Sequence, residues 1–484
     1  MFVPLVAGYV GMYVCGPTVS GESHLGHARP YITFDVVYRY LIHLGYKVRY
    51  VRNITDAGHF EEEGREAEDK ISKKAVIEKL EPMELVQKYT NLFHWAMEKF
   101  NNLPPSIEPT ATGHIVEQIG MIQDIIRAGY AYEANGSVYF DVKKYAEGHD
   151  YGKLSGRVID DLLETTRTLE GQDEKKAKTD FALWKAAPPE HIMRWQSPWG
   201  EGFPGWHIEC SAMATKYLGP QFDIHGGGMD LLFPHHESEI AQSTICNHVP
   251  PVRYWMHNNM ITINGRKMGK SYNNVIKLTE LFSGNHPLLE KAFSPMTVRF
   301  FILQTHYRST LDFGNDALIA AEKGLKRLME AYEWLKQWQI GENSSSQNVN
   351  IELDKKVQNL LGEFESFMDD DFSTAKVLAN MFELVPVINS IKDKTIAPDA
   401  VSAETLQLLK SKMQVYVEDI LGLKAEANAE NDKLKNVIEV LIELRKEARA
   451  KKDWATSDKI RNQLAEAGIQ LKDEKDGNMS WTLS

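Results

Sequence analysis

Two adjacent histidines, His235 and His236, stand just before two glutamates at the predicted start of a helix. They lie in the segment FPHHESEIAQS, which closely follows the glycine-rich segment HGGGMD. Imidazoles and carboxylates at this spacing suit acid–base catalysis or metal binding, and acidic side chains also stabilise the first turn of a helix. His235 and Glu239 are four residues apart and share a helix face, so a metal site is one of three open interpretations.

The cysteines extend the metal interpretation. Cys15 ends a predicted strand and Cys210 lies in GWHIECSAM. With His235 and Glu239 they form a possible tetrahedral Zn²⁺ set, although the spacing is not that of a zinc finger. Core thiols and favourable charges in a first helical turn would explain the same residues without a metal. Cys246 is predicted to be a core residue, and three cysteines in so long a chain favour a reducing, cytoplasmic setting over a disulfide framework.

Two further segments suit phosphate binding. HLGH places His24 and His27 at a predicted helix start, where free N–H groups and the helix dipole favour an anion. KMGKS places Lys267 and Lys270 on a polar turn, where two cations could stabilise a polyphosphate leaving group. Taken singly, a chance HxxH pair and a solvated loop are the better explanations. The pair is more informative than either part.

The elements that position these residues begin with a strand–helix–strand unit. GMYVCGPT predicts a strand and a turn, residues 24–45 a helix, and YKVRYVRNIT a second strand. This order within ~45 residues predicts a βαβ unit in a parallel sheet. EANGSVYFDV predicts a hairpin, FDIH a later strand, and residues 61–100 a highly charged helical segment.

From about residue 310 the pattern is helical, with linker-like breaks at 341–350 and 424–432. The last ~50 residues are predicted to form a compact α+β unit. Its long helix is expected to turn Val437, Leu441, Leu444 and Ala448 inward, and two short strands should follow around a turn at Asp476-Gly477.

Composition limits the possible partners. The 484 residues are 43% hydrophobic and 25% charged, which is ordinary for a globular protein with several domains. A formal charge of −12 argues against indiscriminate nucleic-acid binding and leaves room for a local basic patch. Such a patch is predicted in LRKEARAKKDW, where an aromatic ring follows the cations. No apolar run of ~18 residues predicts a membrane span, and the apolar start lacks the features of a signal peptide.

The two phosphate-binding segments resemble the signatures of class I aminoacyl-tRNA synthetases, usually written HIGH and KMSKS. Longer strings resemble the bacterial cysteinyl-tRNA synthetases: MYVCGPTVSGESHLGHARPYITFDVV, GWHIECSAMA, FDIHGGGMDLLFPHHESEIAQS, KMGKSYNN, HYRSTLDF, DDDFSTAKVL and ARAKKDWATSDKIRNQL. The resemblance implies an α/β fold, with a Rossmann-type parallel-sheet catalytic domain split by an insertion, then a helical bundle and a small α+β anticodon-binding domain. It implies a ligase that activates L-cysteine with ATP and transfers it to the 3′ end of tRNA(Cys). We expect a cytoplasmic monomer that binds neither DNA nor membranes.

The resemblance also implies a role for each motif residue. Zn²⁺ would be held by Cys15, Cys210, His235 and Glu239. ATP, with Mg²⁺, would contact His24, His27, Gly226, Gly227, Gly228, Lys267 and Lys270. Of these, the histidines and lysines would be catalytic. Cysteine would meet Gly16, Thr55, Trp206 and Asp230. The anticodon would meet Arg449, Trp454, Asp458 and Asp473. Zinc suits this substrate because a hydrophobic pocket separates cysteine from serine poorly, whereas zinc favours a thiolate.

The predicted domains follow from the same resemblance. They are a first Rossmann half (1–110), a connective insertion (111–200), a second half (201–256), a stem-contact fold with the KMSKS-like loop (257–310), a helical bundle (311–424) and an anticodon-binding domain (433–484). Within that loop, Gly269 stands where serine is usual, which we expect to alter loop closure but not the lysines.

Two other functions remain open from the sequence. A ligase that joins cysteine to an amino-sugar would share the zinc pocket and both ATP motifs, but it lacks the C-terminal anticodon unit predicted here. A non-catalytic RNA-binding protein with a decayed core is disfavoured by the intact histidines, lysines and proposed zinc ligands.

Overall fold

The computed structural model describes residues 2–57, 75, 80–158, 174–189, 191–269, 272–340, 348–425, 429–473 and 479–483. The chain forms two compact units, Met1–Lys424 and Ala425–Ser484. Among the described residues, no helix combines the length and the apolar character that crossing a bilayer requires.

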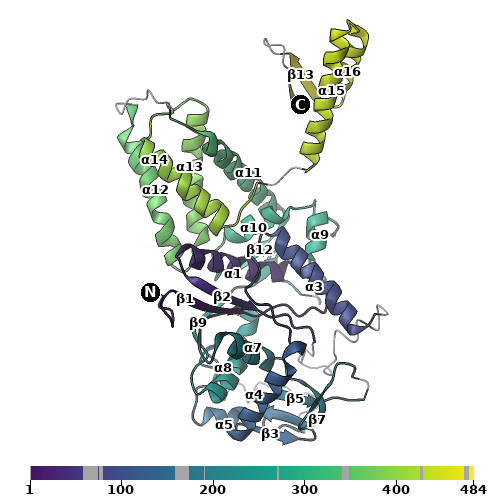
Figure 1. Cartoon of the computed structure of the whole chain (residues 1–484), viewed down its shortest axis with the longest axis vertical. Coiled ribbons are helices and arrows are strands. Elements are labelled where there is room, and N and C mark those ends of the chain that lie inside the picture. Colours follow the sequence, from purple (N-terminus) through teal and green to yellow (C-terminus); the bar gives the residue numbers. More distant parts are fainter. Residues whose placement is uncertain are drawn as a thin grey trace. The chain divides into compact units, whose positions relative to one another are not determined.

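A four-stranded parallel sheet forms the centre of the first unit (Figure 1). Its strands follow the order β2–β1–β8–β9, with bounds Lys47–Arg52, Tyr9–Val14, Phe222–Gly228 and Val252–Asn258. Helix α1 (Leu25–His43) connects β1 to β2, so the predicted βαβ unit and the later strand are confirmed. Val14 pairs with Arg52 on one side and Gly226 on the other. The carboxyl ends of three strands therefore meet at one edge of the sheet, where ligands of such folds bind.

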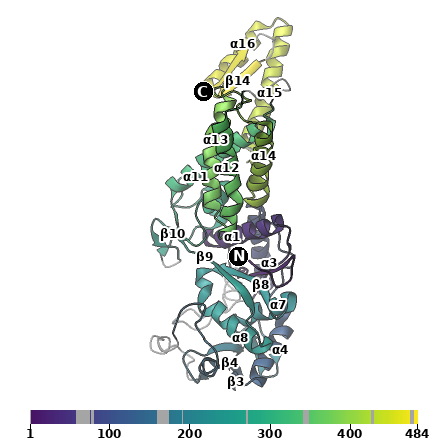
Figure 2. The same cartoon turned by 90° about the vertical axis from the view of Figure 1, so that its left-hand side faces the viewer.

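Helices cover both faces of this sheet. In Figures 1 and 2, α1 lies on one face, and α7 (Ile208–Leu218) and α8 (Glu237–Asn247) lie on the other. The sheet and α1 are rich in buried apolar residues because a parallel strand covered on both sides has no solvent-facing row.

An antiparallel sheet is inserted between β2 and β8. Its order is β3–β4–β5–β7–β6, with bounds Ala131–Ala134, Ser137–Phe140, Phe181–Ala186, Gly200–Pro204 and Trp195–Ser197. The predicted hairpin is its first pair, β3 and β4. Helices α4 (Ile115–Arg127) and α5 (Val142–Ala146) accompany it. The sheet runs on to Pro204, past the predicted boundary at residue 200.

The remaining elements of the first unit are mainly helical. Helix α3 (Pro82–Lys99) confirms the helical prediction for the described end of residues 61–100. A small sheet of β10 (Ile261–Ile263), β11 (Arg266–Lys267) and β12 (Leu311–Phe313) follows β9, accompanied by α9 (Leu278–Ser283) and α10 (Pro295–Leu303). The bundle consists of α11 (Asn315–Gln337), α12 (Ile351–Asp369), α13 (Thr374–Lys392) and α14 (Ala403–Gln414), with the π-helical turn η7 (Val415–Ile420) at its end.

A buried ionic cluster joins the bundle to α1. The guanidinium of Arg299 is fully buried and lies 2.5 Å from the carboxylate of Asp35. It also donates to the carbonyl oxygens of Phe100 and Leu421, at 2.9 Å and 2.7 Å. Arg39 binds the same carboxylate at 2.8 Å. Each buried charge is therefore paired, which burial demands.

The second unit contains α15 (Ala429–Ala450), α16 (Trp454–Glu466) and the antiparallel pair β13 (Ile469–Asp473) and β14 (Met479–Leu483). The two predicted strands are confirmed, and the predicted turn at Asp476-Gly477 lies outside the described residues. The predicted inward face of the long helix is confirmed for two of its four residues. Ala448 is buried and Leu441 packs against the core formed by Ile438 and Ile442, whereas Val437 and Leu444 are 56% and 48% exposed. Both stripes are apolar, so periodicity alone could not choose between them.

Candidate active site

The four proposed metal ligands converge at the carboxyl edge of the parallel sheet. Cys15 follows β1, Cys210 lies in α7, Glu239 lies in α8, and His235 belongs to the π-helical turn η4 (Leu232–His236). Cys15 Sγ lies 3.9 Å from Cys210 Sγ, 3.6 Å from His235 Nε2 and 3.7 Å from Glu239 Oε1. All four ligand atoms lie within 4.8 Å of one another. Zn–S and Zn–N bonds of about 2.0–2.3 Å in a tetrahedron separate ligand atoms by about this much, so the donor set fits Zn²⁺.

The electrostatics of the cluster are those of a site arranged for a cation. Burial raises the pKa of the Cys15 thiol to about 12 and raises that of Cys210 as well. Glu239 is buried, yet contacts with His225 and His235 hold its pKa well below the usual range. Metal binding must therefore displace thiol protons, which a divalent cation does readily.

A second group of four potential ligands overlaps the first. Cys15 and Glu239 also lie within ligand distance of His225 and His236. Cys15 Sγ is 3.3 Å from His236 Nε2, and His225 Nε2 is 2.9 Å from Glu239 Oε2. The sequence interpretation missed His225 as a candidate, although it stands in the quoted string FDIHGGG. The side chain of His235 is 14% exposed and that of His236 is fully buried, so the first group has the more accessible imidazole, while both groups share Cys15 and Glu239.

Further histidines surround the cluster. His207 Nδ1 lies 2.9 Å from His235 Nδ1, and His236 Nδ1 lies 2.7 Å from His257 Nε2. Burial and the neighbouring His235 lower the pKa of His207 to about 3. A ring nitrogen bonded in this way fixes the orientation of a ligating imidazole, as outer contacts of metal sites do.

The HLGH and KMGKS segments lie together. His24 is the N-cap of α1, and its backbone N–H donates to His27 Nδ1 at 3.1 Å. The two rings stack with centroids 3.8 Å apart. Burial, followed by the neighbouring His24, lowers the pKa of His27 to about 3, so His27 is neutral at pH 7. The KMGKS segment lies against HLGH through Met268 and Gly26, since a Cβ on Gly26 would be only 2.6 Å from Met268 Cε.

The side chain of Asn274 supports the KMGKS turn. Its Oδ1 accepts from the Gly269 N–H at 2.9 Å, and its Nδ2 donates to the Lys267 carbonyl at 3.1 Å. Lys267 itself is exposed. The predicted catalytic Lys270 lies outside the described residues.

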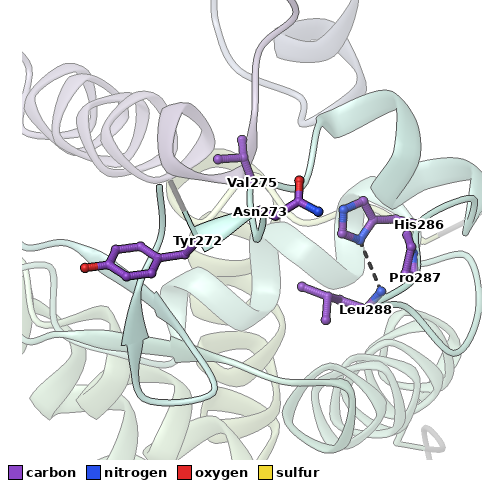
Figure 3. Close-up of a pocket in the computed structure, with 6 residues that line it drawn as sticks. All are labelled: Tyr272, Asn273, Val275, His286, Pro287 and Leu288. Carbon is purple, nitrogen blue, oxygen red and sulfur yellow. Dashed lines mark hydrogen bonds between the residues drawn. The ribbon is translucent and has the colours of Figure 1, made fainter. Parts of the chain in front are cut away.

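A pocket adjoins this segment (Figure 3). It is lined by Tyr272, Asn273, Val275, His286, Pro287 and Leu288. The Leu288 N–H donates to His286 Nδ1 at 3.2 Å, and the Tyr272 side chain is 62% exposed. Figure 3 shows Tyr272 directed away from the other lining residues.

The proposed cysteine-binding residues occupy several strand ends. Gly16 and Thr55 follow β1 and β2, and Thr55 is 7% exposed. Trp206 precedes α7, and its buried Nε1 has no hydrogen-bond partner among the residues described. Asp230 is exposed on the 3₁₀ turn η3 (Met229–Leu231).

Gly226, Gly227 and Gly228 end β8, and the protein itself leaves no space for a Cβ there. At Gly226 it would meet the ring of Phe34 at 2.3 Å, and at Gly227 the ring of His236 at 2.9 Å. Protein packing therefore requires these two glycines, independently of the adenosine for which they were proposed.

The proposed anticodon-contacting residues lie in the second unit. Trp454 begins α16 and is 60% exposed. Asp458 is exposed and pairs with Arg461 at 3.3 Å, and Arg449 is partly buried in α15. The backbone of Asp473 pairs with Met479 in the β13–β14 ladder. Arg445 is 1% exposed, so it does not belong to an exposed basic patch as its charge had suggested.

Comparison with known proteins agrees with this geometry. Residues 1–323 match the family of tRNA synthetases class I (C) catalytic domains, 363–426 the DALR domain, and 431–479 the cysteinyl-tRNA ligase anticodon binding domain. The chain is 58% identical over 487 residues to the cysteine–tRNA ligase of Phocaeicola vulgatus, covering 100% of this chain and 97% of that protein. It is 47% identical over 488 residues to that of Chlorobaculum tepidum, covering 98% and 95%.

Solved structures share the fold at low sequence identity. Methionyl-tRNA synthetase of Mycobacterium tuberculosis, in complex with methionyl-adenylate, superposes with a TM-score of 0.55 at 12% identity and covers 85% of this chain and 89% of that one. A LeuRS–tRNA–LeuAMS complex of Agrobacterium radiobacter K84 gives a TM-score of 0.57 at 12% identity, covering 87% and 85%. On the strength of its catalytic and anticodon-domain matches and its full-length relatives, this chain belongs to the class I cysteine–tRNA ligase family.

Proposed function

We propose that the protein activates L-cysteine with ATP to form cysteinyl-adenylate and transfers the cysteinyl group to the 3′ end of tRNA(Cys). The observation that carries the proposal is the buried cluster of Cys15, Cys210, His235 and Glu239 at the sheet edge where α1 begins. In the first step the cysteine carboxylate attacks the α-phosphate of ATP and pyrophosphate leaves. In the second, a ribose hydroxyl of the tRNA attacks the activated carbonyl and AMP leaves.

The four clustered side chains are the proposed zinc ligands. They offer two thiolates, an imidazole and a carboxylate, which is a donor set that Zn²⁺ accepts and Mg²⁺ does not favour. The partial exposure of His235 leaves an approach for a substrate thiol, whereas the two histidines of the alternative group are 1% and 0% exposed. Bound zinc would supply a thiophilic contact that favours a thiolate over a hydroxyl, which distinguishes cysteine from serine.

The residues around α1 are proposed to hold ATP, with Mg²⁺. Neutral His27 and its neighbour His24 lie at a helix N-terminus, where N–H groups stabilise phosphate charge. Lys267 and Lys270 would stabilise the charge that develops as pyrophosphate leaves. In-line attack then depends on positioning and charge stabilisation more than on a dedicated base. Gly16, Thr55, Trp206 and Asp230 are the proposed contacts to cysteine.

The second unit is proposed to bind the anticodon. Trp454 presents an exposed ring on which a base could stack, and cations of α15 lie nearby in sequence. Arg449, Asp458 and Asp473 are the other proposed contacts, and we retain the six sequence-based domains as proposals. We further propose a monomer in the cytoplasm, where reducing conditions keep Cys15 and Cys210 as thiols.

The test is an amino-acid-dependent ATP–pyrophosphate exchange assay with cysteine and serine in parallel, followed by charging of total bacterial tRNA. We expect exchange and charging with cysteine and neither with serine. Exchange without charging would favour a ligase that uses a small acceptor instead of tRNA. A folded, zinc-loaded protein inactive in both assays would contradict the proposal.

A further inference from the structure

Asn53 lies where three of the proposed site residues meet. Its Oδ1 accepts from the Gly16 N–H at 2.8 Å, and its Nδ2 donates to Thr55 Oγ1 at 2.9 Å. Cys210 Sγ lies 3.9 Å from the same Oδ1. The residue is 1% exposed, and no role has been given to it so far. A buried amide with both ends bonded is held in one orientation.

The surrounding backbone holds this arrangement in place. Gly16 packs so closely on Asn53 that a Cβ on the glycine would lie 1.4 Å from the Asn53 carbonyl oxygen. The Thr55 N–H donates to the Pro17 carbonyl at 3.1 Å, and the Val19 N–H donates to the Thr55 carbonyl at 3.2 Å. The segments that follow β1 and β2 are thus joined residue by residue.

The orientation of the Asn53 amide follows from its partners. A backbone N–H can only donate, so the atom facing Gly16 must be the carbonyl oxygen. The NH₂ group must then face Thr55, where it can only donate. Thr55 Oγ1 therefore accepts from Asn53 and cannot give its own proton back.

The hydroxyl proton of Thr55 is consequently available to a ligand. Across the described ranges, no protein group accepts a hydrogen bond from Thr55 Oγ1. A carboxylate accepts such a proton, whereas an ammonium group offers only donors. We propose that Asn53 is a positioning residue that makes Thr55 a hydrogen-bond donor to the carboxylate of bound L-cysteine. This inference rests on the proposed function of the site.

The test reverses the hydrogen-bond polarity with little change of shape. In Asn53→Asp, one carboxylate oxygen still accepts from Gly16 and the other takes the Thr55 proton. We expect the KM for L-cysteine in ATP–pyrophosphate exchange to rise about 10- to 100-fold, the range for a hydrogen bond to a charged group. Cysteamine has the same thiol and amine but no carboxylate, so its inhibition constant should not change.

Two further measurements separate this role from a structural one. Zinc affinity, measured by competition with a chelator, should be the same in Thr55→Val and the unmodified protein, because the Thr55 side chain lies outside the ligand set. Asn53→Asp does not serve this measurement, since its carboxylate would lie beside Cys210 Sγ. Thr55→Val should raise the KM for L-cysteine similarly, and Asn53→Asp should add no further loss in the Thr55→Val background. If Asn53→Asp does not fold, Thr55→Val decides alone. It should raise the KM for L-cysteine and leave the inhibition constant of cysteamine unchanged.

Several results would overturn the inference. These are an unchanged KM for L-cysteine in either variant, equally weakened binding of L-cysteine and cysteamine, reduced zinc affinity in Thr55→Val, or additive losses in the double variant. If the unmodified, zinc-loaded protein shows no cysteine-dependent exchange, the proposed function fails and this inference fails with it. Exchange in the unmodified protein that Asn53→Asp leaves intact overturns only the role of Asn53.

Discussion

Gly26 and Met268 are in contact, although one belongs to the first helix and the other to the turn that follows β11. A Cβ on Gly26 would lie 2.6 Å from Met268 Cε and about as close to the His24 ring, at 3.0 Å. The HLGH and KMGKS segments are therefore packed through a position that has no room for a side chain. The mobile end of Met268 is the part most able to move away.

Gly26→Ala should impair adenylate formation because its Cβ would crowd the His24 ring, at 3.0 Å, as well as displace the Met268 methyl. We expect exchange activity to fall by at least about tenfold, which corresponds to only ~1.4 kcal/mol of transition-state stabilisation. Met268→Ala in the same chain removes the obstructing methyl and should recover part of the loss. The loss and its recovery are measured by steady-state exchange kinetics of both single variants and the double variant. No recovery in the double variant would assign the loss to the His24 ring instead.

Cys210→Ser should lose both zinc and cysteine activation, because the oxygen is a poorer ligand than a thiolate. Metal content by mass spectrometry and exchange activity measure the two effects. Cys246→Ser is the matched control, since its partly buried thiol lies 3.5 Å from the Met121 carbonyl, outside the cluster. If Cys210→Ser keeps its zinc while His236→Asn loses it, the metal belongs to the alternative group of ligands.

Trp454→Ala should weaken tRNA charging and spare the exchange reaction. A base stacked on an aromatic ring contributes about 1–3 kcal/mol, so kcat/KM for tRNA should fall roughly 5- to 100-fold. Because the ring is 60% exposed, its removal should not unfold the unit. Val440→Ala, equally exposed on α15, is the control that should change neither assay. Parallel losses in charging and exchange would show that Trp454 supports the fold.

Asp35→Ala should destabilise the first unit strongly. It leaves fully buried Arg299 without its carboxylate, and breaking a buried pair in this way costs about 3–5 kcal/mol. Asp370→Ala removes the exposed pair with Lys376, whose side chains are 74% and 54% exposed, and should cost under about 1 kcal/mol. The melting temperature of the first unit, measured for Asp35→Ala and Asp370→Ala, gives the two costs. Similar shifts for both variants would contradict this account of the buried cluster.

Local patterns predicted much of the catalytic fold and little of the site. The strand–helix–strand unit was visible because the apolar face of α1 lies between two short segments rich in valine and tyrosine, β1 and β2. Cys15 and Cys210 are 195 residues apart, so no spacing rule could join them, and only the resemblance grouped the four ligands. Asn53 carried no signal at all, since its role depends on contacts between strand ends.

Helix α15 shows a different limit. Arg445 was assigned to a basic surface by its charge, yet it lies seven residues after Ile438 and three after Ile442, on the buried face of the helix. Its helical spacing from Ile438 and Ile442 could have predicted that Arg445 is buried. That prediction was not made because Val437 and Leu444 were assigned to the inward face. A helix with two apolar stripes requires its partner to be known before either can be chosen.

The distance in sequence between Cys15 and Glu239 has a consequence for biosynthesis. These residues are 224 positions apart, and the whole inserted sheet is made between them. During translation, Cys15 emerges without companion ligands until Cys210 of α7 follows, and the set of four is complete only when α8 has left the ribosome. Metal capture must therefore come after the insertion has been synthesised, and a ribosome stalled before α8 would hold a nascent chain with two cysteines exposed to oxidation.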